Sequence, residues 1–193
     1  MNFPERIESE RITLKRPFPA TLELAEKIYE IVDQSRETLR EWLPWVDKTH
    51  SASDELEHWL KEWCQKHWED GIGYAYLIHD KKTDTILGSV DIINVEERDQ
   101  SGEIGYWLGN HAVGKGYMQE AVQALEKVAF ENGINRIVIR NDTMNLRSVH
   151  VPQRAGYHLD GVMRQDKWDE FHHRLRDTNI WSKLKSDRVN IHE

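Results

Sequence analysis

Two glycines flank a lysine at residues 114–116, in the segment GYWLGNHAVGKGYMQEAV that begins at Gly105. The segment before this loop is apolar and strand-like, and the segment after it has the spacing of a helix. A helix N-terminus carries about four unpaired N–H groups and a partial positive charge. Glycines let the backbone approach an anion closely, and Lys115 adds a full charge. The loop is therefore suited to binding phosphate groups.

Two known phosphate-binding motifs do not fit this loop. A P-loop places Ser or Thr after the lysine, where this chain has Gly116. The dinucleotide fingerprint requires a third glycine three residues after the second, and that position is Gln119. On the tripeptide alone a plain turn stays open, so the anion-binding interpretation depends on the strand before the loop and the helix after it.

The elements that position this loop are read from apolar periodicity and from capping and turn residues. No repeat, linker or low-complexity segment interrupts them, and their mixed order predicts one α+β or α/β domain over residues 1–193. Strands are predicted at residues 11–16, 74–79, 86–93, 103–108, 136–140, 157–163 and 174–181. Helices are predicted at residues 22–32, 36–42, 118–132 and 146–154, and one more begins at the Ser-Ala-Ser-Asp-Glu segment of residues 51–55 and stops by residue 71.

Composition narrows the class of protein. Hydrophobic residues make up 38% and charged residues 31% of the chain, as in water-soluble globular proteins. No apolar run approaches the roughly 18 residues of a membrane span, and the N-terminal segment lacks an apolar signal core, so a cytoplasmic protein is expected. The net charge of −8 disfavours binding to nucleic acid and suits a cationic partner such as an amine.

Metal and disulfide chemistry find little support in the sequence. Cys64 is the one cysteine, so no intramolecular disulfide forms and a buried thiol on a helix is predicted. His172 and His173 are adjacent and would point to opposite faces of a strand. His58 and His67 lie nine positions apart on one predicted helix, outside the i, i+4 pairing of a zinc site. No metal is expected.

The longer segment GEIGYWLGNHAVGKGYMQEAV resembles motif A of the Gcn5-related N-acetyltransferase (GNAT) superfamily. It is most similar to the branch of ribosomal-protein N-terminal alanine or serine acetyltransferases (RimJ/RimL-like). Four other segments resemble the family in the same order, so the resemblance covers about residues 9–184. These segments are ERITLKRPFPATLELAEKIYEIV, LREWLPWVDKTHSASD, NLRSVHVPQRAGY (with Asn145, Ser148, Gly156 and Tyr157) and DTNIWS.

The resemblance implies both a fold and a reaction. The fold is a mixed α/β (α+β) GNAT-like fold: a twisted, mostly antiparallel central sheet of about six or seven strands, splayed in the middle and flanked by helices. The reaction is direct acetyl transfer from acetyl-CoA to a primary amine in a ternary complex. The thioester oxygen is expected at a backbone N–H near Leu108. The pyrophosphate is expected at Val113, Gly114, Lys115, Gly116, Tyr117 and Met118.

Two carboxylates are candidates for the base of such a reaction. Glu103 precedes the loop on the same predicted strand and shares a face with Gly105, so it is the candidate that takes the proton from the amine, directly or through a water. The alternative for Glu103 is a solvated or ion-paired residue of an edge strand. Asp91 on the neighbouring strand is the rival base and an expected residue of the acceptor site.

Two residues of the NLRS segment are assigned to the thioester. Ser148 is expected to donate a hydrogen bond or proton to the leaving sulfur, and Asn145 to hold the thiol arm of CoA. A purely structural alternative is that Asn145 caps a short helix and Ser148 bonds within its first turn. Both descriptions can hold for Asn145.

Three positions depart from the family pattern. His111 stands where the superfamily often has Gln or Arg, and Trp181 stands where Tyr is commoner. Pro152 lies within the predicted helix of residues 146–154 and has no N–H for the carbonyl of Ser148. A kink or an end of the helix is therefore expected close to the serine.

The acceptor is less defined than the cosubstrate. Trp42 and Trp45 lie in a Leu-Pro-Trp loop that borders the acceptor cleft in the family, although a local hydrophobic plug is the alternative. The N-terminal α-amine of a protein is the leading acceptor, and a small amine or antibiotic is the alternative within the same class. A sensor that binds acyl-CoA without catalysis is the rival from another class. A homodimer is expected from the resemblance.

Overall fold

The computed structural model describes residues 1–187 and places eight strands in one sheet, in the order β1-β2-β3-β4-β5-β6-β8-β7. Neighbouring strands are antiparallel except β5 and β6, which are parallel because α5 crosses between them. The sequence missed β1, which is too short to show a period. The strands are β1 Arg6–Glu8, β2 Ile12–Lys15, β3 Tyr74–Asp80, β4 Ile86–Glu96, β5 Ser101–Leu108, β6 Arg136–Asp142, β7 His158–Asp169 and β8 Arg174–Leu184.

The helices follow the predicted order with two differences. The predicted helix of residues 36–42 ends at Leu39, and Pro44 begins a short 3-10 helix instead of only ending the segment before it. The helix capped by Ser51 winds as a π-helix in its middle. The helices are α1 Leu22–Gln34, α2 Arg36–Leu39, η1 Pro44–Lys48, α3 Ala52–Asp54, η2 Glu55–Gln65, α4 Lys66–Asp70, η3 Asn110–Ala112, α5 Tyr117–Glu131 and α6 Leu146–Arg154.

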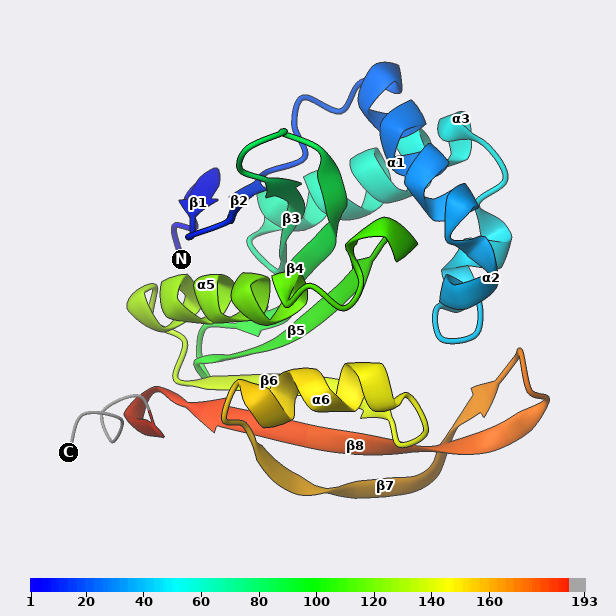
Figure 1. Cartoon of the computed structure of the whole chain (residues 1–193). Coiled ribbons are helices and arrows are strands. Elements are labelled where there is room, and N and C mark those ends of the chain that lie inside the picture. The colour runs from blue at the N-terminus through cyan, green and yellow to red at the C-terminus, as the bar shows by residue number, and fades with distance from the viewer. Residues whose placement is uncertain (188–193) are drawn as a thin grey trace.

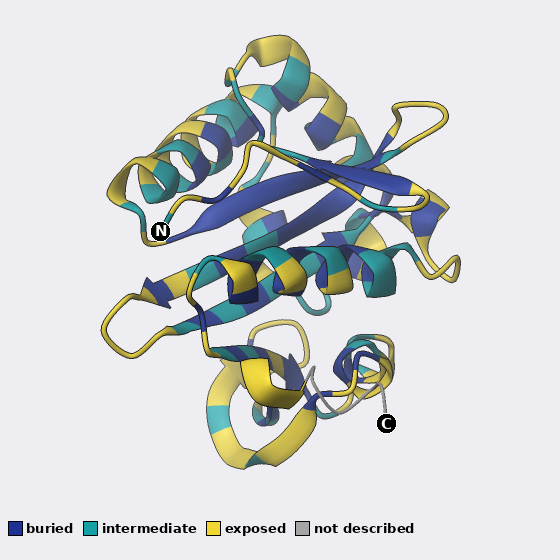
Figure 2. Ribbon diagram, turned by 90° about the vertical axis from the view of Figure 1, so that its left-hand side faces the viewer, coloured by how far each residue is buried: buried dark blue, intermediate teal, exposed yellow. Residues whose placement is uncertain are grey.

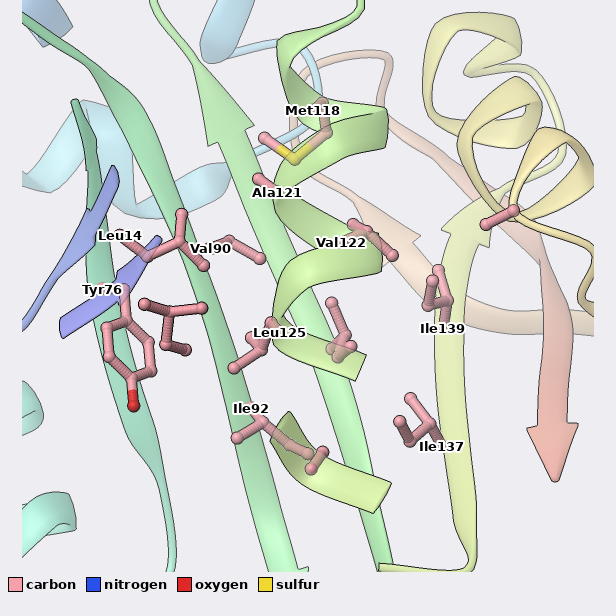
Figure 3. Close-up of a cluster of buried hydrophobic side chains, with 14 of the residues drawn as sticks. Leu14, Tyr76, Val90, Ile92, Met118, Ala121, Val122, Leu125, Ile137 and Ile139 are labelled. Atoms are coloured by element: carbon pink, nitrogen blue, oxygen red, sulfur yellow. The ribbon is translucent and has the colours of Figure 1, made fainter. Parts of the chain in front are cut away.

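The two faces of the sheet carry two separate hydrophobic clusters. On one face, α5 lays Ala121, Val122 and Leu125 against Val90 and Ile92 of β4 (Figure 3). On the other face, α1 and the helices up to residue 70 cover β3 and the end of β5 (Figure 1). The long helices α1 and α5 each bury one apolar stripe, as their periodicity predicts.

The sheet opens between β5 and β6. These strands pair only where Ser101–Glu103 lies beside Arg136–Val138. From Ile104 to Leu108, β5 pairs with β4 alone. The sheet that the resemblance implied is therefore confirmed, including its splay in the middle, and the opening creates space between the two halves.

The β7–β8 hairpin extends beyond the rest of the sheet. Most side chains of β7 are exposed, whereas β3 is almost fully buried and most residues of β4 are buried (Figure 2). Both strands run longer than their sequence patterns predicted, because exposed positions interrupt the alternation. Within residues 1–187, no helix combines the length and the apolar character that a membrane span requires.

Candidate active site

The glycine loop has the backbone geometry that its composition predicted. Gly114 and Gly116 both have left-handed φ angles, +81° and +79°, which side chains with a Cβ adopt only with strain. Gly116 is the N-cap of α5 and offers no side chain to that helix end. Among residues 1–187, the N–H groups of residues 114–119 have no hydrogen-bond partner. The loop thus presents free donors to the space between β5 and β6.

Arg11 supports this loop from the start of the sheet. Its Nη1 donates to the carbonyl of Lys115 at 2.9 Å, and its Nε donates to Glu120 at 2.8 Å. The guanidinium also lies over the ring of Tyr117, with 5.0 Å to the centroid. Three contacts from one side chain fix the loop to the first turn of α5. No local sequence pattern indicates this role, because Arg11 is more than a hundred residues away from the loop.

A cleft of about 590 Å³ runs through the opening between β5 and β6. Its lining includes the glycines of the loop and the first turn of α5, and also Leu39, Trp42 and Leu43. Five basic side chains of β6, α6 and β8 also line it, and sequence patterning did not identify them. They are Arg140, Arg147, His150, Arg154 and Arg176. The charges of the four arginines and the N-terminus of α5 make the cleft attractive to phosphate groups.

Asn145 and Ser148 face the cleft from the start of α6. The side chain of Asn145 caps the helix by accepting from the N–H of Ser148 at 3.1 Å, so its structural role is confirmed. Both residues also line the cleft, together with Tyr106 and Asn141. The hydroxyl of Tyr106 lies 3.2 Å from Oγ of Ser148. Tyr106 is a further residue that the sequence did not single out, because it contacts the serine across the opening.

The carboxylate of Glu103 forms an ion pair with Arg140, at 3.3 Å from its Nε. Asp91 lies opposite Gly105 in the register of β4 and β5, on the same face as Glu103. The N–H of Gly105 donates to Oδ1 of Asp91 at 3.2 Å. Glu103 and Asp91 themselves do not line the cleft, whereas their partners Arg140 and Gly105 do.

The pKa of Asp91 is raised to about 7. Burial of the carboxyl is the main cause, the hydrogen bond from Gly105 opposes it, and the charge of Glu103 adds to it. A carboxyl group with such a pKa exchanges protons near neutral pH. The structure therefore keeps the rival base in a protonation range that suits acid–base chemistry.

The two tryptophans of the Leu-Pro-Trp loop point to different places. Trp42 lines the cleft and lies 6.2 Å from the ring of His172, at the tip of the β7–β8 hairpin. Trp45 packs edge-on against Trp107 at 6.0 Å, and it does not line the cleft. One tryptophan thus faces the acceptor end, and the other packs in the hydrophobic cluster beneath it.

His111, which stands where the superfamily often has Gln or Arg, does not face the cleft as a phosphate contact would. Its Nε2 lies 3.2 Å from the carbonyl oxygen of Ile86, so this ring nitrogen is the donor of the pair. The imidazole therefore faces β4, and His111 is absent from the residues that line the cleft. Cys64 is fully buried, as predicted. Within residues 1–187, no group of three or more His, Cys, Asp or Glu side chains is placed to hold a metal ion.

The structure brings together most of the residues that the sequence singled out. Lys115 points outward, and it contributes only its carbonyl, which accepts from Arg11. Like Glu103, Asp91 and Trp45, its side chain lies outside the lining of the cleft. The expected residues that do line the cleft are Trp42, Leu108, Val113, Gly114, Gly116, Tyr117, Met118, Asn145 and Ser148.

The fold and the basic, glycine-lined cleft have the features of a protein that binds a phosphate-bearing cosubstrate. A family model described as "Acetyltransferase (GNAT) domain" matches residues 11–158. Because this match covers more than half of the chain, the protein belongs to the GNAT acetyltransferase family. It is therefore an enzyme, an N-acetyltransferase that depends on acetyl-CoA.

Named relatives and a solved structure agree with this family. The chain is 28% identical over 169 residues to YdaF of Bacillus subtilis (strain 168), provisionally named a ribosomal N-acetyltransferase, covering 86% of this chain and 89% of YdaF. It is 25% identical over 158 residues to the ribosomal-protein-serine acetyltransferase of Escherichia coli (strain K12), covering 81% and 85%. The microcin C7 self-immunity acetyltransferase MccE, solved with acetyl-CoA and AMP, has a TM-score of 0.81 at 25% identity, covering 91% and 93%.

Proposed function

We propose that the acceptor of this N-acetyltransferase is the N-terminal α-amine of a protein, acetylated by direct transfer in a ternary complex. The observation that carries this proposal is the similarity over most of both chains to an acetyltransferase named for the serine of ribosomal proteins. An α-amine has a pKa near 8, whereas that of a lysine amine is about 10.4. An α-amine therefore needs only a modest base, such as a carboxylate, near neutral pH.

The residues of the cleft fit the cosubstrate at its phosphate groups and at its thioester. The free N–H groups of residues 114–119 would hold the pyrophosphate, with Arg147 and Arg154 adding charge from α6. Asn145 would hold the thiol arm, and the backbone at Leu108 would bind the thioester oxygen. Gly114 and Gly116 keep the loop free of Cβ atoms where the phosphates approach.

Each protein group has a role in the transfer step. When bound, acetyl-CoA supplies a thioester: the amine nitrogen bonds to its carbonyl carbon, and the C–S bond breaks with the electron pair left on sulfur. Ser148 donates a hydrogen bond to that sulfur. Glu103 takes the proton that the amine loses, directly or through a water. Trp42 and the leucines beside it enclose the first residue of the acceptor.

Asp91 is the second candidate for the base, and its raised pKa of about 7 favours it. The pH dependence of kcat separates the two carboxylates. If Glu103 is the base, Glu103→Gln lowers kcat on the order of a hundredfold and Asp91→Asn leaves the shape of the profile unchanged. If Asp91 is the base, the rate of the wild-type enzyme rises through pH 7, and Asp91→Asn abolishes that rise.

The acceptor is tested by thiol release from acetyl-CoA. Peptides that begin with Ser or Ala are compared with the same peptides blocked at the α-amine, with free lysine and with spermidine. We expect release with the free peptides, and mass spectrometry should place the acetyl group on the α-amine. Thiol release with spermidine or lysine, but not with the peptides, would show that the acceptor is a small amine. Binding of CoA without release for any amine would support a sensor instead.

Three further features stay proposals that rest on the sequence. They are one domain over residues 1–193, a cytoplasmic location and a homodimer. Size-exclusion chromatography with light scattering measures the last of these directly.

A further inference from the structure

Pro152 changes which groups bind the carbonyl of Ser148. In an unbroken α-helix, this carbonyl accepts from the N–H of residue 152, and proline has none. Nevertheless α6 continues to Arg154, so the expected end of the helix near the serine is not observed. The carbonyl instead accepts from the hydroxyl of Tyr106 at 3.0 Å and from Nδ2 of Asn141 at 3.2 Å. The first turns of α6 are thereby bound to both β5 and β6 across the opening.

The same hydroxyl of Tyr106 is 3.2 Å from Oγ of Ser148. A phenol has one proton, so Tyr106 donates either to the carbonyl or to the side chain of the serine, but not to both at once. When Tyr106 donates to the carbonyl, the serine hydroxyl donates back to Tyr106. When Tyr106 donates to Oγ, the proton of the serine is free to point into the cleft.

Asn141 allows Tyr106 to donate to Oγ of Ser148 without leaving the carbonyl of Ser148 unpaired. Its amide keeps the carbonyl of Ser148 hydrogen-bonded when Tyr106 turns away, so no buried acceptor is left unpaired. The other side of this amide is fixed, because its Oδ1 accepts from Asn179 and from the indole of Trp181. Because Pro152 has no N–H, the carbonyl of Ser148 accepts from two side-chain donors. The hydroxyl of Tyr106 can therefore change its acceptor while Asn141 keeps the carbonyl hydrogen-bonded.

We propose that Tyr106 is a positioning residue that directs the hydroxyl proton of Ser148 toward the cleft, and that Pro152 enables this by leaving the carbonyl of Ser148 to side-chain donors. This inference rests on the proposed role of Ser148 at the leaving sulfur. Tyr106 remains a donor throughout. Burial raises its pKa to about 12, although the hydrogen bonds with Ser148 and Asn141 lower it. The phenol therefore keeps its proton at neutral pH.

A double-mutant cycle on kcat tests the role of Tyr106. Tyr106→Phe removes only the hydroxyl, and we expect kcat to fall about tenfold, as for the loss of one hydrogen bond that acts in the transition state. Ser148→Ala should lower kcat at least as much. In the Ser148→Ala background, Tyr106→Phe should have no further effect on kcat, because the hydroxyl that Tyr106 orients is gone and the carbonyl of residue 148 keeps its hydrogen bond from Asn141. Calorimetry should give the same affinity for CoA in both single variants as in the wild-type protein.

Tyr76→Phe is the matched control for the loss of a buried phenol. The hydroxyl of Tyr76 donates to the carbonyl of Pro4 at 2.7 Å, away from the cleft. This variant should lose stability like Tyr106→Phe while kcat stays at the wild-type value. A structural role of Tyr106 alone would make the effects of Tyr106→Phe and Ser148→Ala multiply, and that result would overturn the proposal.

Pro152→Ala tests the role of the proline. It restores the N–H, which should bond to the carbonyl of Ser148 and appear as a protected amide in hydrogen exchange of the protein without ligand. We expect kcat to fall severalfold. A protected amide with wild-type kcat would overturn the role of Pro152. If the wild-type enzyme transfers acetyl groups but Ser148→Ala is fully active, the proposed function of Ser148 fails instead, independently of the cycle.

Discussion

At the scale of single residues, Gly116 gives the sharpest test of the phosphate site. Gly116→Asp places a Cβ and a negative charge at a left-handed position, beside free N–H groups. We expect the Kd for acetyl-CoA to rise on the order of tenfold or more, because the charge repels phosphate. Isothermal calorimetry measures this change, and an unchanged Kd would contradict the site.

The control for Gly116→Asp is Gly133→Asp. Gly133 also has a positive φ, of +99°, and a Cβ there would meet nothing within 4 Å. It follows α5 at the end away from the cleft. Both variants should lose stability by about 1–2 kcal/mol from backbone strain, but only the first should bind acetyl-CoA more weakly.

The residues that the sequence identified lie in short local motifs. The glycines could be found because tight turns depend on neighbours in the chain, whereas Asn145 and Ser148 were assigned to the site from the family resemblance of their segment. Tyr106 and Arg11 could not be found in this way. Their partners lie 42 and 104 residues away in sequence, and only the tertiary fold brings them together.

At the scale of elements, the loop depends on a strand that is far from it in the sequence. Arg11→Ala removes three contacts to the loop and to the first turn of α5. We expect the KM for acetyl-CoA to rise about tenfold while kcat changes little, because the loop loses its fixed conformation. Steady-state kinetics at saturating acceptor separates the two parameters.

Arg6→Ala is the control for this change. Arg6 pairs with Glu8 on the exposed edge of the sheet and does not contact the loop. Wild-type kinetics in this variant is expected. An Arg11→Ala enzyme with an unchanged KM would show that the loop holds its shape without the arginine.

Strands and helices with a strong period were predicted well, and the exceptions have physical causes. In η2 the buried residues Glu55, Leu60 and Cys64 are five and four positions apart, which the wider turn of a π-helix keeps on one side. An α-helical period cannot describe this spacing. The splay of the sheet came only from the family resemblance, since no local pattern marks where two parallel strands separate.

At the scale of the whole molecule, burial of acidic groups makes stability depend on pH. Glu55 is 2% exposed, and one of its oxygens has no hydrogen-bond partner within residues 1–187. Burial raises its pKa to about 7 from 4.5. Between these values the folded protein keeps a proton that the unfolded chain has lost. The free energy of unfolding therefore falls as pH rises through this window, and the loss is complete above pH 7.

Glu55→Gln should remove this loss. At pH 5 the Tm of this variant should be close to that of the wild-type protein. At pH 8 its Tm should be higher by a few degrees, which corresponds to a gain on the order of 1–3 kcal/mol in the free energy of unfolding. The exposed Glu57 provides the control, because Glu57→Gln should shift Tm equally at both values of pH. A difference between Glu55→Gln and the wild-type protein that does not grow with pH would show that Glu55 is not charged at pH 8.

The short pairing of β5 with β6 also has a mechanical consequence. Three residue pairs form the seam that joins one plate of the molecule, β1 to β5, to the other plate, β6 to β8. Because it has so few residue pairs, this seam resists relative movement of the two plates less than the longer strand pairings β4–β5 and β6–β8 resist movement of their strands. A ligand that spans the cleft and contacts both α5 and α6 would act as a second seam, and the two plates would then move as one body.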